Sequence, residues 1–315
     1  MRERLMVVAG SSNVPLATEI CHHLGIPLTP VAIRRFSNEN TFVQILESVR
    51  EADVFVIQSL YPAPNEMLVE LMLLCDALRS ASARRITAVI PHYSYARSDK
   101  KDQPRISIAA RLVANVLAAS GADRFLTMTL HSEQVHGFFS RPTDHLQGAP
   151  VVCDYLARTD LSNAVALLDM GQDKRAAGYA ERLNIPVAVM SKRRISDTEV
   201  EITNLIGDVR DRDVIFLDDE ISSATSLMAS VEAVAKLGVR SVRAACTHGL
   251  FCGQACALIE ASPLVEVVST NTVDLPPERR IPKIKVLSVA RLFAEAIKCI
   301  HDGESVGALL RRQDL

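Results

Sequence analysis

Three consecutive carboxylates, Asp218, Asp219 and Glu220, mark the stretch of this chain whose residue types are best suited to chemistry. Four apolar residues at 214–217 precede them and predict a buried strand of a parallel sheet, and an apolar pattern with helical spacing begins at Leu227. In open α/β sheets, ligands bind at the carboxyl ends of the strands, where the next helix begins. Adjacent acids suit sugar hydroxyls or a hydrated divalent cation, and a helix start suits a phosphate. The stretch therefore predicts a site for a sugar phosphate.

A run of small and hydroxyl-bearing residues connects the acids to the predicted helix. Their hydroxyls, with the backbone N–H groups around them, could surround a phosphate. The run comprises Ser222, Ser223, Ala224, Thr225 and Ser226.

A second group of candidates is a basic run at 191–194, which follows a predicted strand and precedes a polar segment at 195–201. Its three cations, Lys192, Arg193 and Arg194, are candidates to contact the negative charge of a phosphate group. A charge run of this kind is also typical of a solvated surface loop. The residues by themselves leave both interpretations open.

Strand-like apolar runs alternate with helical patterns from end to end, which predicts parallel sheets covered by helices on both faces. Strands are expected at 5–8, 54–57, 85–90, 125–130, 165–168, 187–191, 214–217, 239–246 and 265–269. Helices are expected at 16–24, 65–81, 106–120, 227–237 and 289–300.

The acid and hydroxyl run resembles the phosphoribosyl-binding loop of type I phosphoribosyltransferases. Further segments, in the right order, make nearly the whole chain similar to the ribose-phosphate pyrophosphokinase family: 47–50, 91–97, 130–132, 206–209, 247–249 and 270–272. The resemblance implies an α/β fold with two type I phosphoribosyltransferase-like domains, each a mostly parallel sheet flanked by helices. It implies a first domain at 1–147, joined by the C-terminal helix at about 289–315, and a second domain at 148–288.

The activity implied by the resemblance is transfer of pyrophosphate from Mg-ATP to O1 of ribose 5-phosphate, or of a close analogue, giving 5-phosphoribosyl diphosphate and AMP. Catalysis is then implied for Lys192 and Arg194, and ribose 5-phosphate binding for Asp218, Asp219, Ser222, Ser223, Ala224, Thr225 and Ser226. ATP is implied at Arg97 and Asp99, and at Phe36, Asn38 and Asn40 of a neighbouring subunit. Mg2+ is implied as the cofactor, with His131 and Asp169 associated with metal, and phosphate or ADP as an effector at Ser48, Arg50 and Ser305. A homo-oligomer, a hexamer built of dimers, is implied as well.

Several positions depart from the family pattern near the expected site. Thr129 replaces the acid of an Asp-Leu-His triplet, and Ser222 replaces an acid of the phosphoribosyl loop. The two glycines of that loop are Ala224 and Thr225 here. If either position requires a positive φ, a side chain there costs about 1–2 kcal/mol, with β-branched Thr225 the most strained.

Additional acids, Glu133, Asp173 and Glu220, could compensate for the lost ones. An alternative hypothesis is a catalytically impaired paralogue that acts as a regulatory, nucleotide- or phosphate-binding subunit of an active synthetase. A phosphoribosyltransferase acting on a base would leave the two-domain resemblance unexplained.

Composition excludes some classes of function. The net charge of -2 argues against a nucleic-acid-binding protein with a basic face, and no apolar run reaches the length of a membrane span. The first predicted strand begins at once, which leaves no room for a signal peptide, and the seven cysteines are scattered. We therefore expect a cytoplasmic protein that contacts neither nucleic acid nor membrane.

Three potential metal ligands recur at a spacing of four: His248, Cys252 and Cys256. A zinc site could use such a spacing, but no fourth ligand is evident in the sequence. We therefore favour buried thiols on a helix as the explanation of the two cysteines.

Overall fold

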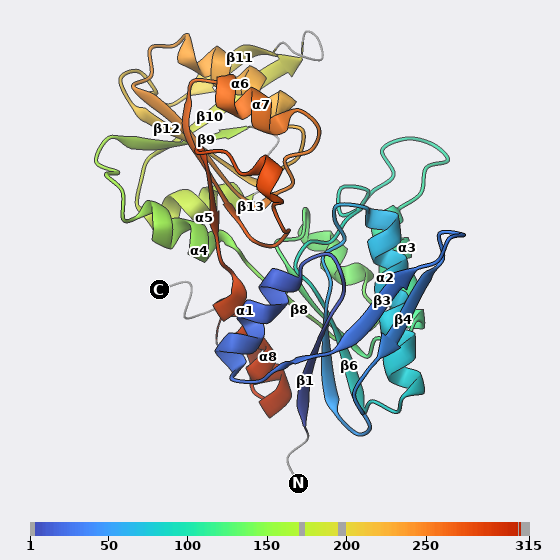
Figure 1. The fold of residues 1–315 in the computed structure, drawn as a ribbon. Coiled ribbons are helices and arrows are strands. Elements are labelled where there is room, and N and C mark those ends of the chain that lie inside the picture. Colours follow the sequence, from blue (N-terminus) through green and yellow to red (C-terminus); the bar gives the residue numbers. More distant parts are fainter. Residues whose placement is uncertain (1–3, 170–173, 195–199, 308, 310–315) are drawn as a thin grey trace.

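The computed structural model describes residues 4–169, 174–194, 200–307 and 309. Two mostly parallel sheets, each between layers of helices, form the described part of the chain (Figure 1). The α/β fold class expected from the alternating sequence pattern is therefore confirmed.

The first sheet is parallel throughout and has the strand order β2-β1-β5-β6-β7-β8. Its strands are β1 (Leu5–Ala9), β2 (Leu28–Thr29), β5 (Asp53–Ile57), β6 (Arg85–Ile90), β7 (Arg124–Met128) and β8 (Thr143–Leu146). An antiparallel hairpin of β3 (Val31–Arg35) and β4 (Thr41–Ile45) lies beside helix α2 (Pro64–Ser80).

The second sheet has the order β11-β10-β9-β12-β13-β14-β15, and within it only the pairing of β11 with β10 is antiparallel. Its strands are β9 (Ala164–Asp169), β10 (Val187–Arg194), β11 (Val200–Ile206), β12 (Asp213–Ile221), β13 (Ser241–Gly249), β14 (Leu264–Thr270) and β15 (Ile284–Leu287).

Helices cover both faces of both sheets. On the first sheet, α2 and α3 (Ala109–Ala119) pack on one face, and α1 (Val14–Leu24) and α8 (Ala290–Asp302) pack on the other. On the second sheet, α6 (Thr225–Ala235) and α7 (Ala255–Ala261) pack on one face, and α4 (Ala149–Leu156) and α5 (Lys174–Leu183) on the other. Two short 3-10 helices lie at Glu133–Phe138 and Pro277–Arg279.

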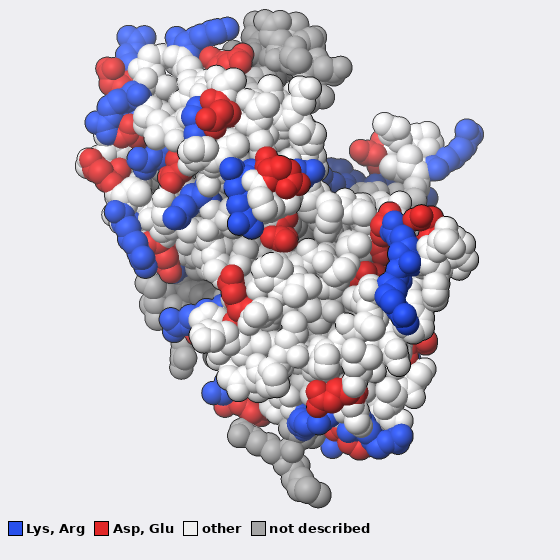
Figure 2. All heavy atoms as spheres, in the orientation of Figure 1, with Lys and Arg blue, Asp and Glu red and all other residues white. Residues whose placement is uncertain are grey.

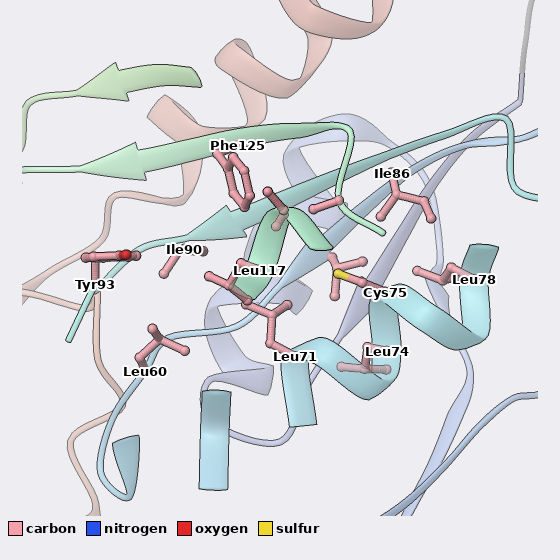
Figure 3. Close-up of a cluster of buried hydrophobic side chains, with 14 of the residues drawn as sticks. Leu60, Leu71, Leu74, Cys75, Leu78, Ile86, Ile90, Tyr93, Leu117 and Phe125 are labelled. Atoms are coloured by element: carbon pink, nitrogen blue, oxygen red, sulfur yellow. The ribbon is translucent and has the colours of Figure 1, made fainter. Parts of the chain in front are cut away.

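The central strands are continuously apolar because both of their faces are buried. Along β5, Val54 and Val56 contribute to the core under α2 and α3, while Phe55 and Ile57 contribute to the core under α1 and α8. Figure 3 shows the first of these cores, where leucines and Cys75 of α2 meet side chains of β6, α3 and β7. Because both faces are packed, the central strands are held in fixed positions, and the loops that follow their carboxyl ends are positioned with them.

The last helix of the described residues to be assigned to a sheet, α8, packs against the first sheet. Helix α8 packs against α1, and the two lie side by side in Figure 1. The chain passes to the second sheet near Gly148, where an added Cβ would lie 2.5 Å from a side-chain carbon of Thr247. We propose the domain boundaries at 147/148 and near 289.

Three strands differ from the sequence expectation in ways that matter for the site. Strand β12 continues to Ile221, so the three acids belong to the strand and not to the loop after it. Strand β10 continues to Arg194, so the backbone of Lys192 also lies in a strand. Strand β7 ends early at Met128, because Thr129 adopts a positive φ of 42°. The sequence did not predict the elements β2, β3, β4, β8, β11, β15, α4, α5 and α7.

Basic and acidic side chains are interspersed on the face shown in Figure 2. This mixed distribution agrees with the small net charge of -2. Among the described residues, no helix is both long and apolar enough to cross a membrane.

A buried ion network ties α8 to the first sheet. Asp53, at the start of β5, is fully buried and accepts hydrogen bonds from Arg85 Nε at 2.8 Å and from His301 Nδ1 at 2.8 Å. We predict that Asp53→Ala lowers the free energy of unfolding by about 3–5 kcal/mol, because both donors lose a buried acceptor. Denaturant titration of the purified variant measures this change.

The matched control is Glu295→Ala, which breaks an exposed ion pair with Arg291 on the same helix. It should lower the free energy of unfolding by at most about 0.5 kcal/mol. Equal effects of the two substitutions would contradict a supporting role for the buried network.

Candidate active site

The candidate site lies where strand ends of the two sheets face each other. His131, just after β7, makes a contact of 2.8 Å between its Nδ1 and Oδ2 of Asp219 in β12. His92, just after β6, makes a contact of 3.1 Å between its Nε2 and Oε2 of Glu220. Carboxyl ends of parallel strands are where such folds bind ligands, so the contacts mark the same edge that the sequence indicated.

The acids are held by the ladder between β12 and β13. Asp218 pairs with Cys246, and Glu220 pairs with His248, which continues the strand well past its apolar part. Neighbouring residues of a strand point to opposite faces. Asp219 accordingly contacts His131, while Glu220 contacts His92 and Arg97.

The two adjacent aspartates have different protonation behaviour. Burial and the neighbouring carboxylate of Asp219 raise the pKa of Asp218 to about 7, with Arg97 acting in the opposite direction. Burial alone would also raise the pKa of Asp219, but hydrogen bonds from His131 and Asp218 outweigh it and hold that pKa below its usual range. Below about pH 7 the pair therefore keeps one proton, and can both donate to and accept from sugar hydroxyls.

The loop at 222–226, between β12 and α6, contains one residue in the left-handed region. Ala224 has φ 60° and directly precedes α6, and its carbonyl accepts from Met228 N at 2.8 Å. The strained position is therefore Ala224, the first of the two replaced glycines, and Thr225 lies within the helix. No side chain of the described residues caps α6, so its first N–H groups can bind an anion.

The hydroxyl groups of the loop point in two directions, one towards the loop after β13 and the other towards the start of α6. Ser222 Oγ donates to Cys252 Sγ at 3.6 Å, which turns this hydroxyl towards the loop after β13. Thr225 Oγ1 donates to Ser223 Oγ at 3.3 Å, and Ser223 and Ser226 are exposed. Ser223 and Thr225 are therefore the hydroxyls that accompany the helix start.

Arg97 is the predicted ATP residue that the structure joins to this site. Its Nη2 lies 3.3 Å from Oε1 of Glu220, and its side chain keeps 55% of its surface exposed. Asp99 lies two residues further along the loop after β6 and is half-buried.

The other predicted ATP residues lie in the turn of the β3–β4 hairpin. Phe36 is half-exposed and packs against Phe42, and Asn38 Oδ1 accepts from Asn40 N at 3.2 Å. The hairpin stands at the outer side of the first sheet, away from β12 (Figure 1). Within one chain, the structure does not bring Phe36, Asn38 and Asn40 to Asp219.

The remaining catalytic candidates are placed only by their backbones. Lys192 and Arg194 lie in β10 opposite Ile202 and Val200 of β11, and Asp169 ends β9. The side chains of these three candidates lie outside the described part of the structure. Asp173 and the polar segment 195–199 also lie outside the described residues.

The predicted effector residues are all exposed. Ser48 and Arg50 lie in the loop before β5, and Ser305 lies just after α8. The contact of 2.8 Å between His301 Nδ1 and Asp53 Oδ2 joins the end of α8 to the start of β5. The two segments therefore lie at the same edge of the first sheet.

His248 has no nitrogen left for zinc. Its Nε2 donates to the carbonyl oxygen of Thr129 at 3.0 Å, and its Nδ1 accepts from the hydroxyl of Thr272 at 2.9 Å. Burial and the neighbouring His92 lower the pKa of His248 to about 4, so the ring is neutral at pH 7. Cys256 Sγ donates to the carbonyl oxygen of Arg279. The expectation of two buried thiols on a helix is only partly met: Cys256 lies on α7, Cys252 lies in the loop before it, and both are partly exposed.

Sequence reasoning did not assign a role to His92. The signal was present, because His92 follows the end of β6 just as His131 follows the end of β7. Of the additional acids, Glu133 is exposed at the start of its 3-10 helix and Glu220 is paired.

Two facing parallel sheets with acids and a helix start at their strand ends define an α/β protein of the phosphoribosyltransferase-like class. A profile described as the N-terminal domain of ribose phosphate pyrophosphokinase matches residues 5–121, and a phosphoribosyl synthetase-associated domain matches residues 194–311. The ribose-phosphate pyrophosphokinase of Deinococcus radiodurans is 49% identical, with 98% of each chain covered. The ribose-phosphate pyrophosphokinase of Caldanaerobacter subterraneus is 45% identical, with 97% of each chain covered.

A solved structure agrees with these sequence relatives. The crystal structure of phosphoribosylpyrophosphate synthetase from Mycobacterium smegmatis has a TM-score of 0.90 at 35% identity, and covers 96% of this chain and 100% of that chain. The chain belongs to the ribose-phosphate pyrophosphokinase family.

The left-handed backbone at Ala224 generates a testable prediction. We expect Ala224→Gly to raise the free energy of unfolding by about 0.5–1 kcal/mol, because glycine tolerates a positive φ while alanine is strained there. Ala233→Gly, within the same helix at an ordinary helical position, should lower it by about 0.5–1 kcal/mol. Denaturant titrations of the ligand-free proteins compare the two, and the same sign for both would sink the assignment of strain to Ala224.

Proposed function

We propose that this protein is a ribose-phosphate diphosphokinase, which transfers pyrophosphate from Mg-ATP to O1 of ribose 5-phosphate. The observation that carries the proposal is one junction that combines three features: the acid pair Asp218–Asp219, the uncapped start of α6, and Arg97. The first suits ribose hydroxyls, the second a 5-phosphate, and the third a nucleotide. Membership in the family supports the same reaction.

The chemistry requires positioning more than covalent help from the protein. The anomeric oxygen of ribose 5-phosphate must attack the β-phosphorus of ATP in line with the leaving AMP. In this proposal Asp218 and Asp219 orient the ribose, and Ser223, Thr225 and the N–H groups of α6 hold its phosphate. Arg97 and Asp99 belong to the nucleotide side, and Lys192 and Arg194 stabilise the transferring group.

The donor set fits a magnesium ion that arrives with ATP. Mg2+ prefers oxygen ligands, keeps several waters, and commonly uses one or two carboxylates together with substrate phosphates. Among the described residues, no cluster of three or more His, Cys, Asp or Glu side chains is arranged to hold a metal ion. We propose that Asp169 contributes a carboxylate and that His131 acts by orienting Asp219. The ion would neutralise charge on the phosphates.

We also propose a cytoplasmic homo-oligomer, a hexamer built of dimers, in which Phe36, Asn38 and Asn40 serve a neighbouring subunit. Native mass measurement tests the assembly.

Phosphate or ADP is proposed to bind near Ser48, Arg50 and Ser305 as an effector. A thermal shift with phosphate that Arg50→Ala does not share would support the effector site, and equal shifts would contradict it.

The proposed reaction predicts AMP release from ATP that depends on both ribose 5-phosphate and magnesium. Lys192→Ala and Arg194→Ala should each lower turnover by about 10²–10³-fold with little change in KM for ribose 5-phosphate, because their charges act on the transferring group. Steady-state assays of AMP release measure both quantities. Arg193→Ala removes the same charge from the same strand and is the matched control.

Unchanged turnover in the Lys192 and Arg194 variants would contradict a catalytic role and would favour the interpretation of the basic run as a solvated surface segment. If the native protein released no AMP, the enzyme hypothesis would be wrong and the regulatory-subunit alternative would be favoured.

A further inference from the structure

Glu220 connects the two halves of the molecule with both of its carboxylate oxygens. Oε2 accepts from His92 Nε2 at 3.1 Å, and Oε1 lies 3.3 Å from Arg97 Nη2. Both partners come from the loop after β6 of the first sheet, whereas Glu220 lies in β12 of the second sheet. One side chain therefore spans the junction at the candidate site.

The environment of Glu220 keeps it ionised and well ordered. Burial alone would raise its pKa, but the hydrogen bond from His92 and the charge of Arg97 outweigh it, and the pKa is below its usual range. An ionised carboxylate only accepts hydrogen bonds, so His92 Nε2 must be the donor. The side chain of Glu220 is only 16% exposed.

His92 is fixed from several sides so that Nε2 points to Glu220. Its ring centroid lies 5.0 Å from that of His248 and 6.2 Å from that of Tyr61, both in edge-on arrangements. Its carbonyl accepts from Leu60 N at 2.9 Å. Its Nδ1 is buried without a hydrogen-bond partner in the described structure. An unsatisfied buried nitrogen is costly, which indicates that this ring orientation is maintained by the bond to Glu220 and by packing.

Arg97, in contrast, is only partly used by Glu220. Its contact with Glu220 involves Nη2, and more than half of its side-chain surface remains exposed. A guanidinium has five N–H donors in a fixed plane, so a carboxylate at one end orients the rest. Arg97 also lowers the pKa of Asp218, which shows that its charge reaches the acid pair.

We propose that Glu220 is a positioning residue, supported by His92, that holds Arg97 beside the acids of β12. It would thereby fix the position of the nucleotide site relative to the ribose site. This inference rests on the proposed function, which assigns ATP to Arg97. A fixed guanidinium binds a polyphosphate more tightly than a mobile one, because less side-chain entropy is lost on binding.

The proposal predicts that removing the charge of Glu220 weakens Mg-ATP binding, whereas simple charge repulsion predicts that it tightens binding. A carboxylate near a triphosphate repels it, so removing only a charge would tighten ATP binding. If Glu220 instead positions Arg97, Glu220→Gln should weaken Mg-ATP binding by about tenfold, the scale of one charge-assisted hydrogen bond. Calorimetric titration with Mg-ATP measures the dissociation constant without any need for turnover.

A double-mutant cycle with Arg97 separates positioning from a general structural role. In an Arg97→Ala background, Glu220→Gln should change the dissociation constant for Mg-ATP by less than about twofold, because the group that it positions is gone. In steady-state assays of the otherwise native protein, KM for ATP should rise far more than KM for ribose 5-phosphate. The control is Glu266→Gln, which removes the same charge near the start of β14, at the edge of the second sheet away from the candidate site. It should leave the dissociation constant for Mg-ATP and KM for ATP at their native values.

A second variant, His92→Phe, keeps an aromatic ring and the charge of Glu220 but removes the supporting donor. The His92→Phe variant should also weaken Mg-ATP binding. It tests the proposal in place of Glu220→Gln if the Glu220→Gln variant does not fold. Tighter binding by Glu220→Gln, or additive effects of Glu220→Gln and Arg97→Ala, would overturn the proposal. A native protein that binds Mg-ATP but releases no AMP would refute only the proposed function, and one that does not bind Mg-ATP would refute both.

Discussion

Burial of the carboxylates at the end of β12 is the constraint on which the junction of the two sheets depends. A buried carboxylate is destabilising unless hydrogen bonds or an opposite charge compensate for the water it has lost. In this protein the compensating groups belong to the other sheet: His131 serves Asp219, and His92 and Arg97 serve Glu220. The contacts that allow acids at the strand end therefore also align the two halves around the space between them.

Neutral hydrogen bonds reinforce that alignment beside the charged pairs. Asn13 Nδ2 donates to the carbonyl of Asn271 at 2.8 Å, and the hydroxyl of Tyr61 donates to the carbonyl of Leu250 at 2.7 Å. His248 adds the bond to Thr129, with a ring that stays neutral at pH 7. None of these contacts needs a charged group, so arriving phosphates do not compete with them electrostatically.

Two strained backbone positions lie at the same place. Thr129 and Ala224 both have positive φ values without being glycine, and each lies at a strand end or helix start of the candidate site. Such residues cost about 1–3 kcal/mol and persist only where other contacts hold them. Thr129 is held by Gly148 N, which donates to its hydroxyl, and by His248, which donates to its carbonyl. The rigid framework of two-sided strands thus supports a strained edge where ligands are expected.

The sequence by itself determined the alternation of strands and helices, the acids that end one strand, and the helix that follows them. These signals are local, since they depend on side-chain periodicity and on residue types close together in the chain. It did not determine how far β10 and β12 continue, because polar residues such as Asp218 join a strand only when a neighbouring ladder supplies hydrogen bonds. It also did not reveal that Ala224 adopts the left-handed conformation. The partnership of His92 and Arg97 with Glu220 was decided only by the tertiary structure, because those residues are more than a hundred positions apart and meet where two separate sheets bring their strand ends together.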